Sequence, residues 1–262
     1  MPPPVLAFLT DFGARDHYVG AMKGAALSVC PGATLVDITH EIDPQDVLGG
    51  ALELAAVVPY FPPGTVFVAV VDPGVGSARR AIAAEAGAYR FVAPDNGLLA
   101  LVFDELPPRL VVELTERRFA RPVVSRTFEG RDRFAPAAAW LACGTELSEL
   151  GTPRPDWHRL AVPPAELTGH ELRGEVLRID RFGNLVTNIT RSTLARLAAS
   201  EPVLVLVGPH RIPLVSTYSD VPSQALCALF GSSDRLEVAV NAGSAARHLG
   251  VGRGAPVVVT RG

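Results

Sequence analysis

Three aspartates occur where predicted strands of the first half of the chain end. They are Asp11 after residues 5–10, Asp72 after residues 65–71, and Asp95 after residues 90–93. Parallel sheets bind ligands beyond the carboxyl ends of their strands. One Asp beside Gly or Asn would more simply order a turn. Three on neighbouring strands indicate a polar site, with Asp95 nearest to plain turn chemistry.

The segment that begins at Asp72 reads Asp-Pro-Gly-Val-Gly-Ser-Ala-Arg-Arg. Its two glycines allow the backbone to approach a ligand closely, and its arginines can return toward the acid. A phosphate cradle is not predicted, because no Lys-Ser or Lys-Thr follows the glycines.

Two further polar clusters follow. Residues 125–132, Ser-Arg-Thr-Phe-Glu-Gly-Arg-Asp, carry four charges around a glycine before an Ala-rich helix, and would also suit a solvated helix start. Residues 180–188 join two strands of the second half, where a hairpin tip needs Gly and Asn anyway.

The elements that must position these clusters change character along the chain. In the first part, apolar runs alternate with helical patterns, which predicts an α/β domain with a mostly parallel sheet. Prolines accumulate around residues 152–164, as in a linker. Beyond them, short apolar runs broken by turn residues predict a smaller all-β, barrel-like domain with one short helix at 244–249. We expect the domains to span residues 1–165 and 166–262.

Composition excludes several classes of partner. A net charge of −3 with scattered arginines does not favour binding of nucleic acid, and no apolar run is long enough to cross a membrane. The N-terminus lacks the features of a signal peptide, so we expect a cytoplasmic protein. Cys30, Cys143 and Cys227 each lie in apolar sequence, which predicts buried free thiols. The six histidines show no metal-ligand spacing, and we expect neither metal nor cofactor.

These clusters, in this order, resemble the S-adenosylmethionine hydroxide adenosyltransferases, relatives of the fluorinase and chlorinase. The resemblance covers nearly the whole chain: Thr10–Gly13 with Asp16, then residues 72–80, 93–98, 127–138, 182–189 and 241–243. It implies an enzyme that hydrolyses S-adenosylmethionine at C5′ to adenosine and methionine.

The resemblance also implies an assembly and a set of substrate contacts. The family pattern is a homotrimer whose sites lie between one subunit's α/β domain and a neighbour's β-rich domain. On this pattern Asp11 binds the ribose hydroxyls, Asp180 and Asn184 hold the methionine or nucleoside end, and Asn241 and Ala242 meet adenine through their backbone. Further substrate contacts are assigned to Asp16, Phe128, Gly130, Phe182 and Ser233.

The catalytic residues that the resemblance implies are an Asp, an Arg and a His around the attacking water. The first two match Asp72 and Arg79, whereas Glu129 replaces the His. A second carboxylate near Asp72 would raise one pKa unless an arginine such as Arg79, Arg126 or Arg131 intervenes. Glu129 could therefore share a proton with Asp72 or turn away into a salt bridge.

Three alternatives compete with hydrolysis. Halide transfer is disfavoured because Asp72 stands where the halogenating relatives have Tyr, and a carboxylate repels halide. The fluorinase also has Thr at Val75, Ser at Gly130 and an aromatic residue at Gln45. A non-catalytic binder of S-adenosylmethionine or adenosine is the second alternative. A calcium-dependent nucleoside hydrolase ranks last, because its aspartate cluster is absent from the sequence.

Overall fold

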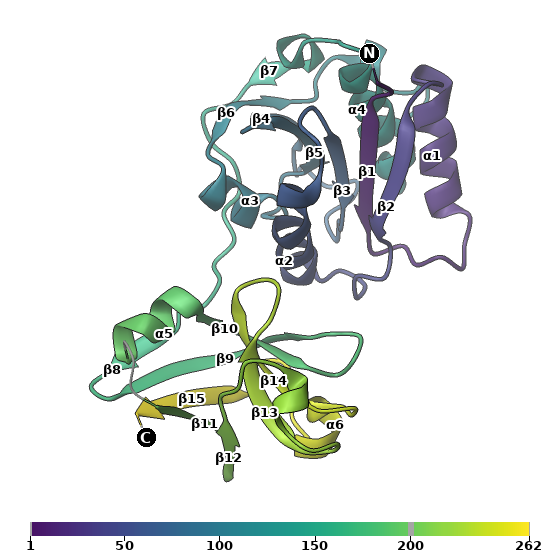
Figure 1. The fold of residues 1–262 in the computed structure, drawn as a ribbon. Coiled ribbons are helices and arrows are strands. Elements are labelled where there is room, and N and C mark those ends of the chain that lie inside the picture. Colours follow the sequence, from purple (N-terminus) through teal and green to yellow (C-terminus); the bar gives the residue numbers. More distant parts are fainter. Residues whose placement is uncertain (1, 199–201, 262) are drawn as a thin grey trace. The chain divides into compact units, whose positions relative to one another are not determined.

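Parallel strands form the part of the first sheet that carries the three aspartates. The computed structural model describes residues 2–198 and 202–261 and divides into two units, Met1–Leu160 and Ala161–Gly262. The first sheet has the order β2-β1-β3-β5-β4-β6-β7 (Figure 1). Its parallel strands are β2 (Thr34–Thr39), β1 (Val5–Thr10), β3 (Val66–Val70) and β5 (Tyr89–Pro94). Its antiparallel strands are β4 (Ala81–Ala86), β6 (Pro108–Glu113) and β7 (Thr152–Pro153).

Helices cover both faces of this sheet, which explains the continuous apolar runs of its strands. Along β1, Leu6 and Phe8 join one hydrophobic core, whereas Ala7 and Leu9 join the other. Two helices contribute to the first core, α1 (Tyr18–Val29) and α4 (Ala135–Ala142). Two others contribute to the second, α2 (Val47–Val57) and α3 (Ala100–Glu105). The predicted α/β class is confirmed.

Two buried elements of this unit were not predicted, and the short exposed strand β7 lies where the sequence predicted a linker. β4 has the sequence Ala-Ile-Ala-Ala-Glu-Ala, whose alanines favour a helix, yet it is a fully buried strand between β5 and β6. α3 is only six residues long and lies in a continuously apolar stretch. At β4, burial within the sheet outweighs the helix propensity of alanine, whereas the uniform apolar pattern around α3 hides its helical period.

The prediction for two of the three cysteines is wrong. Cys30 and Cys143 form a disulfide, with 6.0 Å between their Cα atoms, and Cys143 is exposed. Each cysteine follows the last residue of a helix, and α1 and α4 pack together, so the two helix ends meet despite a sequence separation of 113 residues. Cys227 is a buried free thiol, as predicted.

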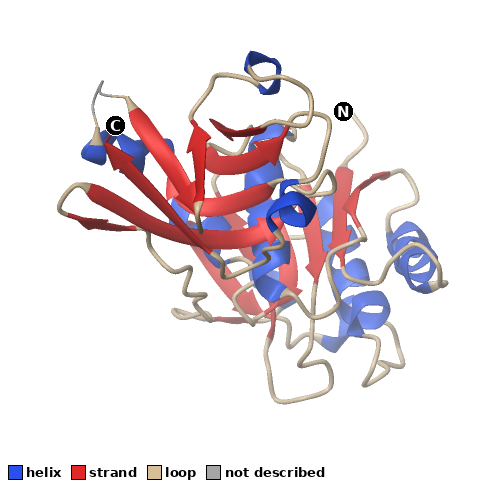
Figure 2. Ribbon diagram, turned by 90° about the horizontal axis from the view of Figure 1, so that it is seen from below, coloured by secondary structure: helices blue, strands red, loops and turns tan. Residues whose placement is uncertain are grey.

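The second unit is built around an antiparallel, nearly closed sheet. The strand order is β12-β11-β15-β9-β10-β14-β13, and β8 pairs with β9. A bridge between Leu214 and Ala228 brings the two ends of this order together. Strands predominate here, in contrast to the first unit (Figure 2). The strands are β8 (Glu166–Thr168), β9 (Glu171–Ile179), β10 (Leu185–Thr190), β11 (Val203–Val207), β12 (His210–Pro213), β13 (Leu226–Phe230), β14 (Arg235–Val240) and β15 (Pro256–Arg261).

The predicted short helix is present as α6 (Ala245–Leu249), but the unit also contains α5 (Arg191–Leu197), which was not predicted. Thr190 caps α5 by accepting a hydrogen bond from the Thr193 amide at 3.2 Å. Leu194 and Leu197 are the buried side chains of this helix. Among the described residues, no helix is long and apolar enough to span a membrane.

Candidate active site

The three predicted aspartates follow adjacent parallel strands. Asp11 follows β1, Asp72 lies two residues beyond β3, and Asp95 follows β5, in the spatial order β1-β3-β5. Asp95 serves the fold: it pairs with Arg80 at 2.6 Å and accepts a hydrogen bond from the His158 amide at 2.7 Å. It thereby anchors the segment that leaves the first unit. The candidate site is built on the other two.

Arg79 lies between two buried carboxylates. Its Nε atom is 3.0 Å from both carboxylate oxygens of Asp72, and its Nη2 atom donates to Asp72 Oδ2. The same Nη2 atom donates to Glu129 Oε2 at 2.6 Å. Side-chain exposures of 5% for Asp72, 11% for Arg79 and 12% for Glu129 show that all three are shielded from bulk water. Of the alternatives left open by the sequence, the structure has Glu129 paired to Arg79, which separates the carboxylates.

The guanidinium of Arg79 is held in its charged form. Burial alone would lower the pKa of Arg79, but hydrogen bonds and charge interactions with Asp72 and Glu129 outweigh burial and raise it. The Arg79 guanidinium carbon also lies 5.2 Å from the centroid of the Phe134 ring. These contacts restrain Arg79 from several sides, so it can orient both carboxylates.

The loop from Asp72 to Arg79 depends on close contact with the second polar cluster. Gly76 has φ +76°, and a Cβ atom there would lie 2.4 Å from the carbonyl oxygen of Arg126. Only glycine avoids both the strained conformation and the clash. This contact holds the loop of Asp72 and Arg79 against the segment that carries Glu129.

Replacing Gly76 by alanine is expected to lower the free energy of unfolding by at least about 1 kcal/mol, the cost of a left-handed conformation for a residue with a Cβ. The clash with Arg126 should also move Arg79. Urea denaturation measures the first effect. Gly74→Ala is the matched control, because its Cβ would contact the Arg79 side chain only at 3.3 Å. Equal stability of the Gly76→Ala variant and the wild type would contradict this reading of the loop.

Glu129 precedes a single π-helical turn, Gly130–Phe134, which runs directly into α4. Within this turn Asp132 is completely buried and receives two hydrogen bonds from Arg131, at 2.7 and 2.8 Å. It also accepts the Ser125 amide at 2.9 Å. Burial would raise the pKa of Asp132, but these bonds and the charges of Arg131 and Arg121 lower it. Asp132 therefore folds the 125–132 segment around a buried charge.

Asp11 is partly buried beside Gln45, the position at which the fluorinase has an aromatic residue. Gln45 has φ +70°, and its amide donates to Asp11 Oδ2 at 2.8 Å. Burial and the negative charge of Asp72 raise the pKa of Asp11, although backbone hydrogen bonds oppose the rise. Asp11 therefore belongs to the same electrostatic environment as Asp72.

An aromatic group borders the 125–132 segment. Phe12, Tyr18 and Phe128 pack edge to face or tilted, with ring centroids 5.1 to 5.9 Å apart. Together with His17 and Arg131 they line a cavity of about 420 Å³. Gly130 lies beneath, where a Cβ atom would be 3.4 Å from the Phe12 ring. Asp16 is exposed in the loop between β1 and α1, and no hydrogen bond or ion pair among the described residues joins it to Asp72 or Arg79.

In the second unit, Asp180 organises a tight turn. One of its carboxylate oxygens accepts the amides of Phe182 and Asn184 at 2.9 and 2.8 Å, and the other accepts the Asn184 side chain at 2.9 Å. Phe182 is 77% exposed at the tip. Gly183 has φ +89°, and a Cβ there would lie 2.1 Å from Ser244 Oγ, at the start of α6. The turn therefore packs directly on the segment after Asn241.

The loop after β14 carries the predicted adenine contacts. Asn241 donates from its side chain to the carbonyl of Val221 at 2.8 Å, so this side chain has a structural partner. Ala242 is exposed with φ +57°, and its carbonyl accepts the Gln224 side chain at 2.7 Å. Ser233, in the turn before β14, is partly exposed. Asp180 and the Asn241 loop are thus close together, whereas no hydrogen bond between described residues connects Ser233 with either.

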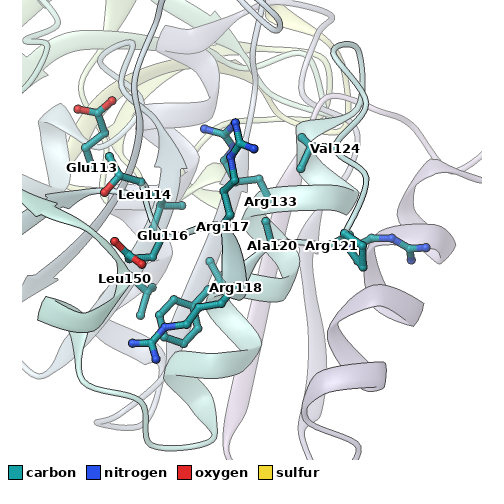
Figure 3. A pocket seen from close by; sticks show the side chains of 14 residues that line it. Glu113, Leu114, Glu116, Arg117, Arg118, Ala120, Arg121, Val124, Arg133 and Leu150 are labelled. Atoms are coloured by element: carbon teal, nitrogen blue, oxygen red, sulfur yellow. The ribbon is translucent and has the colours of Figure 1, made fainter.

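A second cavity, of about 710 Å³, lies beside the segment that carries Glu129. Figure 3 shows its wall, which includes Arg117, Arg118, Arg121 and Arg133 together with Glu113 and Glu116. Arg133 also reaches Glu129, with Nη2 3.6 Å from Oε1. Arg133 was not predicted as a site residue. The sequence contains one indication of this contact, because Arg133 follows Glu129 by four residues, the spacing at which side chains on a helix are neighbours.

Known proteins are similar to this chain over nearly its whole length. Family models for the N-terminal and C-terminal domains of the SAM hydroxide adenosyltransferases match residues 6–151 and 174–258. An (R)-S-adenosyl-L-methionine hydrolase of Thermus thermophilus is 43% identical over 95% of this chain and 97% of its own. A fluorinase of Actinoplanes sp. is 33% identical over 98% of both chains.

A solved structure agrees with these matches. The crystal structure of an uncharacterised conserved protein from Thermotoga maritima is similar with a TM-score of 0.92, at 35% identity, and covers 98% of this chain and 100% of that one. The likeness therefore extends over sequence and fold and includes both units. The chain belongs to the SAM hydroxide adenosyltransferase family.

Proposed function

We propose that the chain hydrolyses S-adenosyl-L-methionine at C5′, with water as the nucleophile, and releases adenosine and L-methionine. The observation that carries the proposal is the buried Asp72–Arg79–Glu129 cluster at the ends of the parallel strands. Membership of the family and similarity to a relative named (R)-S-adenosyl-L-methionine hydrolase support it. We propose the same R epimer, defined at the sulfonium centre, as the preferred substrate.

The chemistry asks for alignment more than for acid catalysis. A sulfonium departs as a neutral thioether, so the leaving group needs no proton. In the proposed step, a water oxygen attacks C5′ opposite to sulfur, the C5′–S bond breaks, and its electron pair stays on sulfur. Asp72 accepts the proton that the water loses. Arg79 keeps the carboxylate of Asp72 oriented toward this task.

Halide transfer is disfavoured by the same cluster. Asp72 and Glu129 place two carboxylates within reach of one guanidinium, so the region carries no surplus positive charge from Arg79. A halide ion would have to approach these anions in a poorly solvated place, where like charges repel strongly. Water has no such penalty and can donate a hydrogen bond to either carboxylate.

We assign the substrate contacts as follows. Asp11 receives the ribose hydroxyls, with Asp16, Phe128 and Gly130 nearby along the nucleoside. Asp180, Phe182, Asn184 and Ser233 hold the methionine end, and the backbone of Asn241 and Ala242 meets adenine. Support for the last assignment is that Ala242 is exposed while its carbonyl already accepts Gln224, which leaves the N–H to a ligand.

The proposal includes the assembly and the requirements of the enzyme. We propose a homotrimer in which a neighbour's second unit completes each site, to be checked by light scattering. We propose that no metal or cofactor takes part, because the sulfonium is already activated. A cytoplasmic location is proposed because S-adenosylmethionine is made and used inside cells.

The test is a product assay in ¹⁸O-labelled water. The purified full chain is incubated with each sulfonium epimer, in chloride-free buffer and in chloride, with and without EDTA. We expect adenosine and methionine in equal amounts, label in the 5′-hydroxyl of adenosine, faster turnover of the R epimer and no effect of EDTA. Formation of 5′-chloroadenosine would favour halide transfer instead. Tight binding of substrate without products would favour a non-catalytic binder.

A further inference from the structure

The two carboxylate oxygens of Glu129 have different arginine partners. Oε2 accepts the hydrogen bond from Arg79 at 2.6 Å, whereas Oε1 faces Arg133 Nη2 at 3.6 Å. Arg79 belongs to the loop after β3, while Arg133 lies four residues after Glu129, in the π-helical turn that Glu129 precedes. A second guanidinium therefore reaches the proposed catalytic cluster from a separate element.

The carboxylates around Arg79 outnumber its single positive charge, so a second guanidinium can compensate the excess negative charge. Asp72 and Glu129 both contact Arg79, so their two negative charges meet one positive charge there. Asp11 adds a further carboxylate, close enough to Asp72 for its charge to raise the pKa of Asp11. Arg131 forms its ion pair with Asp132, and Met22 of α1, which lies beside Gly130, carries no charge. Among these neighbours, Arg133 is the cation that brings the Asp72 and Glu129 pair to neutrality.

The position of Arg133 argues against a purely structural role. Its side chain is 33% exposed and lies on the wall of the 710 Å³ cavity, where Figure 3 also shows Arg117. A partly exposed ion pair with a 3.6 Å separation contributes little to stability. It can still favour one orientation of the shielded carboxylate, because Arg133 faces Oε1 while Arg79 binds Oε2.

We propose that Arg133 is a positioning residue for the hydrolysis: its guanidinium attracts Oε1 of Glu129 so that Oε2 stays turned toward Arg79, and so allows a glutamate to occupy this place beside Asp72. The inference rests on the proposed function, since only then does the cluster face the reacting water. Arg133 acts through Glu129 and does not touch the substrate. Loss of Arg133 leaves two carboxylates to share one guanidinium, so Glu129 can turn away and Arg79 holds Asp72 less firmly in place.

The experiment compares Arg133→Met with Arg133→Lys and with Arg117→Met. Arg117 lines the same cavity but is not among the arginines that pair with Glu129 in the described part of the chain, so it is the matched control. We expect Arg133→Met to lower kcat roughly tenfold, the equivalent of about 1.4 kcal/mol in the activation free energy, with little change in KM or Tm. Lysine should restore most of the rate, and Arg117→Met should match the wild type.

A second background isolates the partner through which Arg133 acts. In Glu129→His, the carboxylate that Arg133 serves is gone, so adding Arg133→Met should change the rate less than twofold. The same tenfold loss in both backgrounds, or an equal loss in Arg117→Met, overturns the inference. Should Glu129→His be inactive, the comparison of Met, Lys and the Arg117 control decides. An inactive wild type refutes the proposed function, whereas an active wild type matched by Arg133→Met refutes only this inference.

Discussion

Replacing Asp72 by asparagine is expected to lower kcat for adenosine formation by about 100- to 10,000-fold, the usual contribution of a positioned proton acceptor. Asparagine has nearly the same shape and can still accept a hydrogen bond from Arg79, but it cannot take a proton from water. Binding of S-adenosylmethionine should change little, because Asp72 is assigned to the nucleophile. Chromatography of adenosine over time measures the rate, and calorimetry measures binding.

Asp95→Asn is the matched control for this experiment. Asp95 also follows a parallel strand and pairs with an arginine, Arg80, but it anchors the segment at His158. We expect the Asp95 variant to melt at a lower temperature while its kcat at 25 °C stays close to the wild-type value. If Asp72→Asn keeps more than a tenth of the wild-type rate, Asp72 is not the proton acceptor.

Replacing Asp132 by asparagine is expected to lower the free energy of unfolding by about 1.5 to 3 kcal/mol, the range for hydrogen bonds to a charged group. Asp132 is fully buried and receives two bonds from Arg131. Urea denaturation at pH 7 measures the loss. Asp156→Asn is the control, because Asp156 pairs with Arg80 at 3.0 Å but is 72% exposed, so its loss should change stability far less than the loss of Asp132 does.

The pH dependence of stability provides a second reading of Asp132. Its pKa is lowered from 3.8, so the unfolded chain binds a proton here before the folded chain does. The stabilisation by Asp132 is therefore complete above about pH 3.8 and is lost as the pH falls below that value. Asp11, whose pKa is raised from 3.8, acts in the opposite direction above that pH. Asp132→Asn should remove the acid-side loss, and an unchanged acid slope would contradict the assignment.

The arrangement of strands was largely predictable because it depends on strong local signals. The strands before Asp11, Asp72 and Asp95 are apolar runs that end in turn residues, and these patterns place acids at one edge of a parallel sheet. β4 was not predictable from its own residues, because alanine reports helix propensity while burial between two strands decides the outcome.

The contacts within the site were predictable only in part. Residue types suggested that an arginine separates Asp72 from Glu129, and three arginines qualified. The choice of Arg79 depends on the path of the loop, which Gly76 sets by its contact with the backbone of Arg126. Pairing of Cys30 with Cys143 depends likewise on two helix ends that meet only in the folded chain. Contacts between residues this far apart in sequence cannot be predicted from the residues that surround each of them.

The π-helical turn Gly130–Phe134 makes the spacing of this segment as important as its composition. The Ala135 amide bonds to the carbonyl of Gly130, five residues earlier, so the turn holds one residue more than an α-helical turn. Deleting one residue would restore a regular helix, but everything before the deletion would rotate by roughly 100° relative to α4. Glu129 would then leave Arg79 although no functional side chain had been lost. Length variation should therefore be tolerated far less well here than substitution at exposed positions.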